Sequence, residues 1–188
     1  MEVQLSFEQA LELLNKYVKK QNLIYHSLAS YAVMKAIAKR LGENENKWAL
    51  AGLLHDIDVE ITNNNPLIHG IEGAKILKQA GVDEEIIDAI VRHNEMAADK
   101  KRITPLHHAL AAGETITGLI IATTLVYPSK KIIDVKAKSI LKRMKEKNFA
   151  ATVDRNAILE CEKINIPIQE FAEIALKAMQ EIGHEIGL

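Results

Sequence analysis

The residues best suited to chemistry in this sequence are its histidines, and four of the seven stand at or near the ends of predicted helices. They are His26, His69, His93 and the first residue of the pair His55-Asp56. The pair ends an apolar run, residues 49–54, that should be buried. Two polar side chains in such a place must be paired or bound, because burying them unpaired is costly. Imidazole and carboxylate together suit a divalent transition metal such as Mn, Fe, Co, Ni or Zn.

Cysteine is nearly absent from the sequence, which contains only Cys161. One cysteine excludes a disulfide framework and fits a reducing compartment, so the sequence predicts a cytoplasmic protein. It also excludes a structural zinc site built from several thiolates. A metal site in this sequence must therefore use nitrogen and oxygen ligands.

Composition and charge narrow the classes of protein to which the sequence can belong. The chain has 188 residues, of which 48% are apolar, and its 24 basic and 25 acidic residues nearly cancel. This length and apolar content predict one folded domain, and the balanced charge argues against nucleic acid as a partner. The longest nearly uninterrupted apolar stretch, residues 118–127, has about half the length of a membrane span, so no membrane association is expected.

The elements that must position the histidines are predicted to be helices throughout, because no segment alternates convincingly with period two. Ser6 and Gln9 form a capping box at the first helix start. Gly42 is placed to end the second helix, and Thr104-Pro105 is a start signal. The predicted helices are about Phe7 to Lys19, His26 to Leu41, Glu45 to Leu54, Leu67 to Ala80, Asp83 to His93, Thr104 to Tyr127, Val135 to Lys147, Asp154 to Ile164 and Ile168 to Ile186. The predicted fold class is all-α.

The order of the histidines resembles the HD-domain superfamily of metal-dependent phosphohydrolases, whose pattern is a histidine, then His-Asp, then further histidines, then a late aspartate. The matching segments are Tyr25-His26-Ser27, Leu53-Leu54-His55-Asp56-Ile57-Asp58, Ile68-His69-Gly70 and Val91-Arg92-His93-Asn94-Glu95. The stretch from Thr117-Gly118 through Pro128-Ser129-Lys130 is similar to a subgroup of small HD hydrolases. The resemblance implies a compact helical bundle forming a single domain over residues 1–188, with a core at about 22–130 and additional C-terminal helices at 131–188.

The resemblance also implies a ligand set. Asp56 would bridge two metal ions, and Asp56 and His55 would be the catalytic residues. One metal site would be completed by His26, His55 and Glu114, and the other by His69 and His93. The main alternative is a single ion held by His26, His55, Asp56 and Glu114. The presence of both later histidines favours two ions.

Glu114 departs from the subgroup pattern, in which the residue three positions before Thr-Gly is aspartate. Glutamate is one methylene longer and can still ligate. Alternatively, Glu114 is a partly exposed helix residue paired with a lysine, and Asp99 takes its place. Gly113 favours the first interpretation, because a glycine inside a helix is explained by the close approach of a neighbouring group.

Other polar residues have two interpretations each. Asp58 and Glu60 either orient the imidazoles or belong to a solvated loop. His107 and His108 lie in the first turns of a helix and are expected at the surface, as is His184 near the C-terminus.

A basic segment follows the candidate site. Residues 130–147 contain eight basic residues against Asp134 and Glu146. They form either a solvated face or a positive rim that attracts phosphorylated substrates. Lys130 and Arg92 are the predicted substrate-binding residues.

The function implied by the resemblance is hydrolysis of a phosphomonoester or phosphodiester by a metal-activated hydroxide. The expected partner is a nucleotide or another small phosphorylated metabolite. Two alternatives stay open: a non-catalytic metal- or nucleotide-binding regulatory protein, and a di-iron oxygenase. Homo-oligomerisation through the apolar face of residues 168–186 also stays open.

Overall fold

The structure is a computed structural model that describes residues 5–188, so the first four residues of the predicted domain 1–188 lie outside it. The described chain folds into helices and contains no strand within residues 5–188, which confirms the all-α prediction. The α-helices are α1 (Phe7–Tyr17), α2 (Gln21–Leu41), α3 (Glu45–Leu54), α4 (Ile71–Gln79), α5 (Glu84–His93), α6 (Glu95–Ala98), α7 (Pro105–Leu125), α8 (Ala137–Lys145), α9 (Arg155–Leu159) and α10 (Ile168–Glu181). Two 3₁₀ helices, η1 (Ile132–Asp134) and η2 (Glu160–Ile164), complete the chain.

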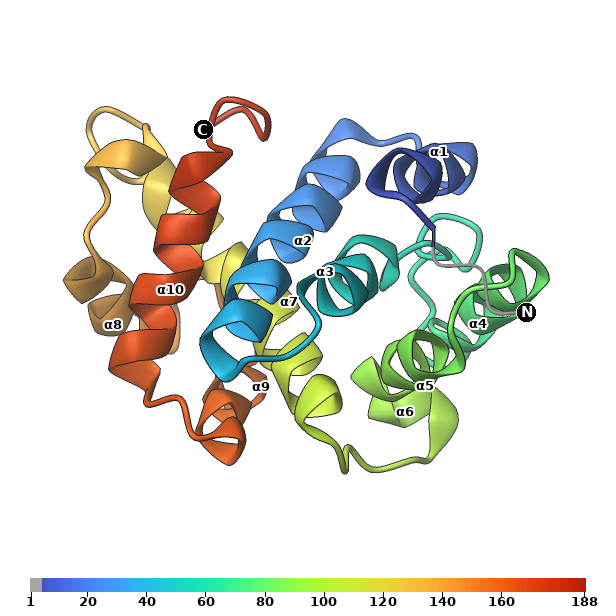
Figure 1. Cartoon of the computed structure of the whole chain (residues 1–188). Helices are drawn as coiled ribbons and strands as arrows, with labels where there is room; N and C mark the ends of the chain where they lie inside the picture. The colour runs from blue at the N-terminus through green and yellow to red at the C-terminus, as the bar shows by residue number, and fades with distance from the viewer. Residues whose placement is uncertain (1–4) are drawn as a thin grey trace.

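Helix α7 is the centre of the bundle. It contacts α2, α3, α5, α8, α9 and α10, and Figure 1 shows α4–α6 on one side of it and α8 and α10 on the other. It has the length and hydropathy of a membrane span, but 61% of its most apolar window is buried by the surrounding chain. Its place in the core therefore accounts for its apolar composition.

Local signals at several helix ends act as predicted. The Ser6 hydroxyl and the Gln9 side chain each accept a hydrogen bond from the other residue's backbone N–H, and Thr104 caps α7 by accepting from the His107 N–H. Gly42 ends α2 with φ of +74°, the left-handed region that glycine enters without steric cost. Such caps satisfy the backbone groups that a helix end leaves free.

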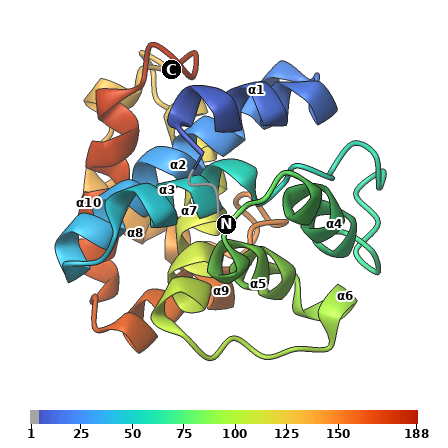
Figure 2. The same ribbon diagram turned by 45° about the vertical axis from the view of Figure 1, so that its right-hand side comes forward.

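Two helices begin at residues that the sequence pattern does not indicate. Helix α2 starts at Gln21, so His26 lies inside the helix and not at its first residue. Helix α4 starts at Ile71 and not at Leu67, because residues 66–70 form turns. Figure 2 shows this connection between α3 and α4 as a long loop at the edge of the bundle.

Glycines allow α2 to pack closely against its neighbours. A Cβ atom on Gly52 of α3 would lie 2.5 Å from the Ser30 carbonyl oxygen of α2, which leaves no room for it. A Cβ on Gly113 of α7 would lie 2.9 Å from the Met34 sulfur, so Gly113 allows core packing against α2. The close approach predicted at Gly113 is therefore present, and the group that approaches is Met34 of the core and not a candidate ligand.

We expect Gly52→Ala to lower the free energy of unfolding by about 1–3 kcal/mol, because the added methyl must separate α3 from α2. Gly118→Ala is the matched control: the new Cβ would make ordinary contact with Val153 at 3.4 Å, and alanine raises helix propensity by up to about 1 kcal/mol. Urea unfolding of both variants checks this. Equal stability of the two variants would show that the α2–α3 contact tolerates a methyl group.

Candidate metal centre

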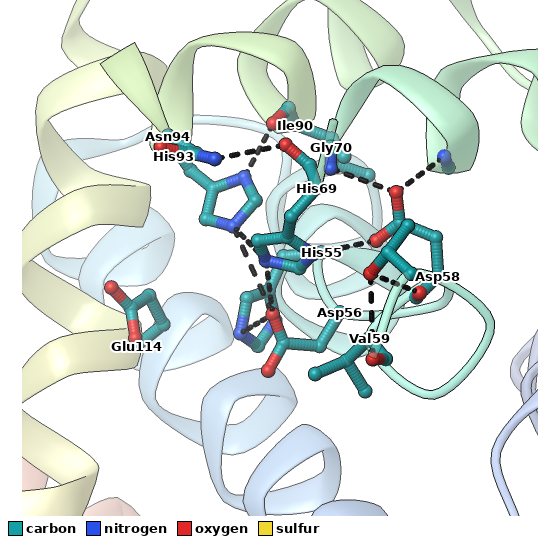
Figure 3. Close-up of polar contacts among 12 residues, drawn as sticks. His55, Asp56, Asp58, Val59, His69, Gly70, Ile90, His93, Asn94 and Glu114 are labelled. Carbon is teal, nitrogen blue, oxygen red and sulfur yellow. Dashed lines mark hydrogen bonds and ion pairs between the residues drawn. The ribbon is translucent and has the colours of Figure 1, made fainter. Parts of the chain in front are cut away.

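The structure brings the six predicted metal ligands together from five parts of the chain. They come from α2, the end of α3, the turn before α4, the end of α5 and the middle of α7, and several are drawn in Figure 3. The six form two groups in which the potential ligand atoms lie within 4.8 Å of one another: His26, His55 and Glu114, and Asp56, His69 and His93.

The Asp56 carboxylate lies between the two groups. Its Oδ1 is 3.1 Å from His69 Nε2, 3.4 Å from His55 Nε2 and 3.8 Å from His93 Nε2. Its Oδ2 is 3.7 Å from His26 Nε2. One carboxylate therefore faces imidazoles of both groups, as a bridging ligand would.

Free carbonyls at helix ends hold two of the imidazole rings. His55 Nδ1–H donates to the Gly52 carbonyl at 2.7 Å, and His93 Nδ1–H donates to the Ile90 carbonyl. Both acceptors lie three residues earlier, in the last turn of α3 and α5, where carbonyls lack intrahelical partners. A proton on Nδ1 leaves the Nε2 lone pair of each ring directed into the site.

His26 is held in the same tautomer by Thr117 of α7. The Thr117 hydroxyl donates its single proton to the Glu114 carbonyl at 2.6 Å, so it accepts from His26 Nδ1–H at 2.9 Å. Burial lowers the pKa of His26, and it lowers the pKa of His55 and of His93 to about 4, so these rings are neutral.

The resulting donor set fits a cation. His26 Nε2 and His55 Nε2 face each other at 3.1 Å, a hydrogen-bond distance, yet both rings have their proton on Nδ1. Two lone pairs directed at one another in a buried site repel unless a positive charge lies near both. Imidazole nitrogen with carboxylate oxygen is a donor set that divalent transition metals accept.

His69 differs from the other three histidines, because it lies between two carboxylates. Its Nε2 faces Asp56 and its Nδ1 lies 2.7 Å from Asp58 Oδ1. Burial opposes a charge on this ring, but hydrogen bonds to Asp56 and Asp58 outweigh it and raise the pKa of His69 to about 10. Without a metal, the ring therefore has a second proton on Nε2, the atom that would bind the metal.

Asp58 orients His69 and also begins a helix. Its side chain is fully buried, and its Oδ2 accepts from the backbone N–H groups of Gly70 at 2.8 Å and Gly73 at 2.7 Å. A Cβ on Gly73 would crowd Asp58 at 3.3 Å. Of the two interpretations of this residue, the structure shows the orienting one. Glu60 instead accepts from the Lys20 N–H at 2.8 Å, near the start of α2.

Glu114 reaches the site despite its departure from aspartate. Its Oε2 is 3.8 Å from His26 Nε2, and its Oε1 accepts from the Thr115 hydroxyl. Burial and the nearby Asp56 charge raise the pKa of Glu114 to about 8. Asp99, the alternative ligand, is exposed and belongs to neither group.

The two predicted substrate-binding residues lie outside the cluster. Arg92 Nε donates to Asp88 at 2.8 Å, and Nη1 of the same residue donates to the Lys101 carbonyl. Lys130 is exposed and follows the end of α7, and at about 1.5 Å per residue that end lies about 16 Å along the axis from Glu114. Both roles stay predictions.

His107 is buried, so its expected surface position is wrong. Its Nδ1 accepts from the N–H groups of Ile103 and Thr104, and its Nε2 lies 3.1 Å from Asp88. It thus caps α7 and joins it to α5. His108 is half-buried against Glu160, and His184 is exposed as predicted.

Sequence reasoning assigned no role to two residues that support the ligands. One is Thr117, and the other is Asn94, whose side-chain amide donates to the carbonyls of Pro66 at 2.8 Å and His69 at 3.0 Å. Asn94 thereby holds the turn before α4 against the end of α5, so that His69 faces His93 (Figure 3). Both residues lie inside the segments that resemble the HD pattern, which was the available signal.

Comparison with known proteins identifies the family. The HD domain profile matches residues 23–125, more than half of the chain. The chain therefore belongs to the HD domain family, and the resemblance to HD-domain metal-dependent phosphohydrolases is confirmed.

Curated relatives match the same part of the chain. It is 33% identical over 98 residues to Ribonuclease Y 2 of Levilactobacillus brevis and 36% identical over 98 residues to Ribonuclease Y of Nitratidesulfovibrio vulgaris. It is 35% identical over 83 residues to Ribonuclease Y of Mesoplasma florum. The matches cover 52%, 52% and 44% of this chain but only 18%, 18% and 16% of these relatives.

Asp58→Asn should weaken metal binding by roughly 10–100-fold, because the variant loses the carboxylate charge that lies 2.7 Å from His69 Nδ1. Glu60→Gln is the matched control, since Glu60 is two residues away and contacts α2 instead. Competition with a chromogenic chelator measures both affinities. Equal affinities in the two variants would remove Asp58 from the site.

Metal binding should release protons and strengthen as the pH rises. Glu114 keeps its proton below pH about 8 and His69 keeps its second proton below pH about 10. Both must leave before ligation, so the apparent affinity for Mn²⁺ should rise by roughly tenfold per pH unit for each proton released. Calorimetry in buffers of different ionisation enthalpy counts the protons, and Glu114→Gln should release about one fewer. A proton count that Glu114→Gln leaves unchanged would contradict ligation by Glu114.

Proposed function

We propose that this protein is a metal-dependent phosphohydrolase that cleaves a phosphodiester or phosphomonoester bond of a nucleotide or another small phosphorylated metabolite. The observation that carries the proposal is the pair of neutral imidazoles, His26 and His55, whose Nε2 atoms face each other at 3.1 Å beside two carboxylates. Membership in the HD family supports the same reaction class.

The six clustered residues would hold one or two divalent ions, with His26, His55 and Glu114 on one side of Asp56 and His69 and His93 on the other. Bound there, the ions would polarise phosphoryl oxygens and lower the pKa of a water molecule. The surrounding histidines hold the pKa of Asp56 well below its usual range against the effect of burial. Asp56 is therefore ionised in this environment.

The chain's own residues supply orientation and proton control. The Nδ1 protons of His26, His55 and His93 are accepted by Thr117, Gly52 and Ile90, so these three rings direct Nε2 inward. Asp58 forms an ion pair with Nδ1 of His69. Glu114, with a pKa of about 8 before an ion binds, would release its proton on ligation.

The reaction proposed here needs no nucleophilic side chain. The single cysteine, Cys161, is buried, and burial raises the pKa of its thiol to about 12, so the thiol stays protonated. Attack by water fits this residue set.

For the substrate, we propose a phosphodiester of ribonucleotides as the first class to test, since the matched relatives are named Ribonuclease Y. The balanced net charge of −1 favours small substrates over long nucleic acids. We further propose that the protein acts in the cytoplasm, without a membrane partner, which is consistent with its single free cysteine.

Hydrolysis should require both an ion and Asp56. We expect Asp56→Ala to reduce turnover by at least about a thousandfold, since the variant loses a carboxylate that faces histidines of both groups. The assay compares cyclic nucleotides, dinucleotides, nucleoside monophosphates and single-stranded oligoribonucleotides with Mn²⁺, Co²⁺, Ni²⁺, Mg²⁺ or Fe²⁺. Glu60→Gln is the control and should keep full activity.

Two outcomes would replace the proposal with another function, and a third would change the proposed substrate. Metal binding without turnover on any substrate would favour a non-catalytic regulatory protein. Oxygen consumption by the iron-loaded protein would favour a di-iron oxygenase. Turnover of oligoribonucleotides alone would keep the reaction class and overturn the preference for small substrates.

A further inference from the structure

Arg102 caps the end of α5, the helix that ends at His93. Its Nε donates to the Arg92 carbonyl at 3.1 Å, and its Nη2 donates to the His93 carbonyl at 2.5 Å. These carbonyls belong to the last residues of the helix, where no intrahelical donor is available. A cation is also favoured there by the helix dipole. Arg102 therefore fixes the backbone on which the His93 ring is mounted.

Glu160 holds Arg102 in that position. Its Oε1 accepts from Arg102 Nη1 at 2.8 Å, and both side chains are only 13% exposed. Its Oε2 lies 2.7 Å from His108 Nδ1 of α7. The exposed Lys163 is more distant, at 3.7 Å. One carboxylate thus joins the cap of α5 to the central helix.

Glu160 lies outside the part of the chain that matches the HD family. It opens η2, which follows α9 beneath α7 in Figure 1 and packs against α7. The matched residues end at 125. Cys161 and Ile164 of η2 are buried, so the backbone that carries Glu160 is anchored in the core.

The ring of His93 is hydrogen-bonded to its own helix and packs edge-on against the rings of His55 and His69. Its Nδ1 proton goes to the Ile90 carbonyl of the same helix, so the ring moves with the end of α5. Its Nε2 is 3.0 Å from His69 Nε2 and 3.8 Å from Asp56. A shift of this helix end would separate His93 from those two residues and leave His26, His55 and Glu114 in place.

We propose that Glu160 is a positioning residue for the candidate metal ligand His93 and acts through Arg102. The inference rests on the proposed function, in which His93 is a ligand. It makes the C-terminal segment part of the site: the chain beyond the HD-matched residues supplies the charge that keeps the cap of α5 in place. The expected defect of a Glu160 variant is confined to the ion that depends on His93.

The test is Co²⁺ binding to the full chain, followed by visible absorption and by elemental analysis of the bound metal. His93→Ala defines the ion that depends on His93. Glu160→Gln should weaken the binding of that same ion by about tenfold or more, as the loss of a residue that orients a ligand does in metal sites. The affinity for any other ion should stay unchanged. Glu162→Gln, an exposed position on the same 3₁₀ helix, is the matched control and should bind as the wild type does.

A double-variant cycle separates positioning from general destabilisation. If Glu160 acts through Arg102, the double variant Glu160→Gln with Arg102→Gln should lower the affinity for this ion no more than Arg102→Gln alone does. Arg102→Lys, which keeps the charge but lacks the forked geometry, should weaken the same ion even if Glu160→Gln fails to fold.

Unchanged binding of the His93-dependent ion in Glu160→Gln, or in Arg102→Lys, would overturn this inference and leave the proposed function intact. Equal weakening of every bound ion would also overturn it, since that result indicates a general loss of structure. Failure of the wild-type protein to bind Co²⁺, or of His93→Ala to lose an ion, would overturn the ligand role of His93 itself.

Discussion

Four imidazole rings must direct their Nε2 lone pairs into one small space, and the arrangement of the bundle follows from this requirement. Each ring needs an acceptor for its Nδ1 proton on the side away from the site. For His55 and His93, that acceptor is a carbonyl three residues earlier, which is free only at a helix end. Helices α3 and α5 therefore have to end at their candidate ligands, and the loops after them begin beside the candidate site.

The same requirement makes the packing of α2, α3 and α7 tight. His26 of α2 contacts both His55, at the end of α3, and Thr117 of α7. Helix α2 therefore has to lie close to α3 and to α7. Gly52 and Gly113 provide the space, because each faces an atom of α2 at a distance that no Cβ tolerates. The glycines of the apolar segments thus support the candidate metal centre indirectly, because they bring α2 near enough for His26 to enter the cluster.

The sequence predicts the helices and the clustering of the ligands well, because both depend on local signals or on an ordered motif. Caps such as Ser6 and Thr104 act within a few residues, so their effect is readable from spacing. The start of α4 is not readable in this way, since Asp58 captures its first N–H groups from twelve and fifteen residues away. His107 was misplaced for a similar reason: its partner Asp88 belongs to another helix. The family pattern marks the segment that contains Thr117, but its contact with His26 joins residues 91 positions apart and is not readable from local spacing.

The two oxygens of Asp58 have different partners: Oδ1 faces the His69 ring, while Oδ2 accepts from the first N–H groups of α4. Fraying at the start of α4 and release of His69 are consequently one local opening event. Amide hydrogen exchange at Gly70 and Gly73 would then report on the chemistry of the site, slowing when a cation occupies it. The exchange rates of two backbone amides would therefore report whether an ion is bound at the proposed site.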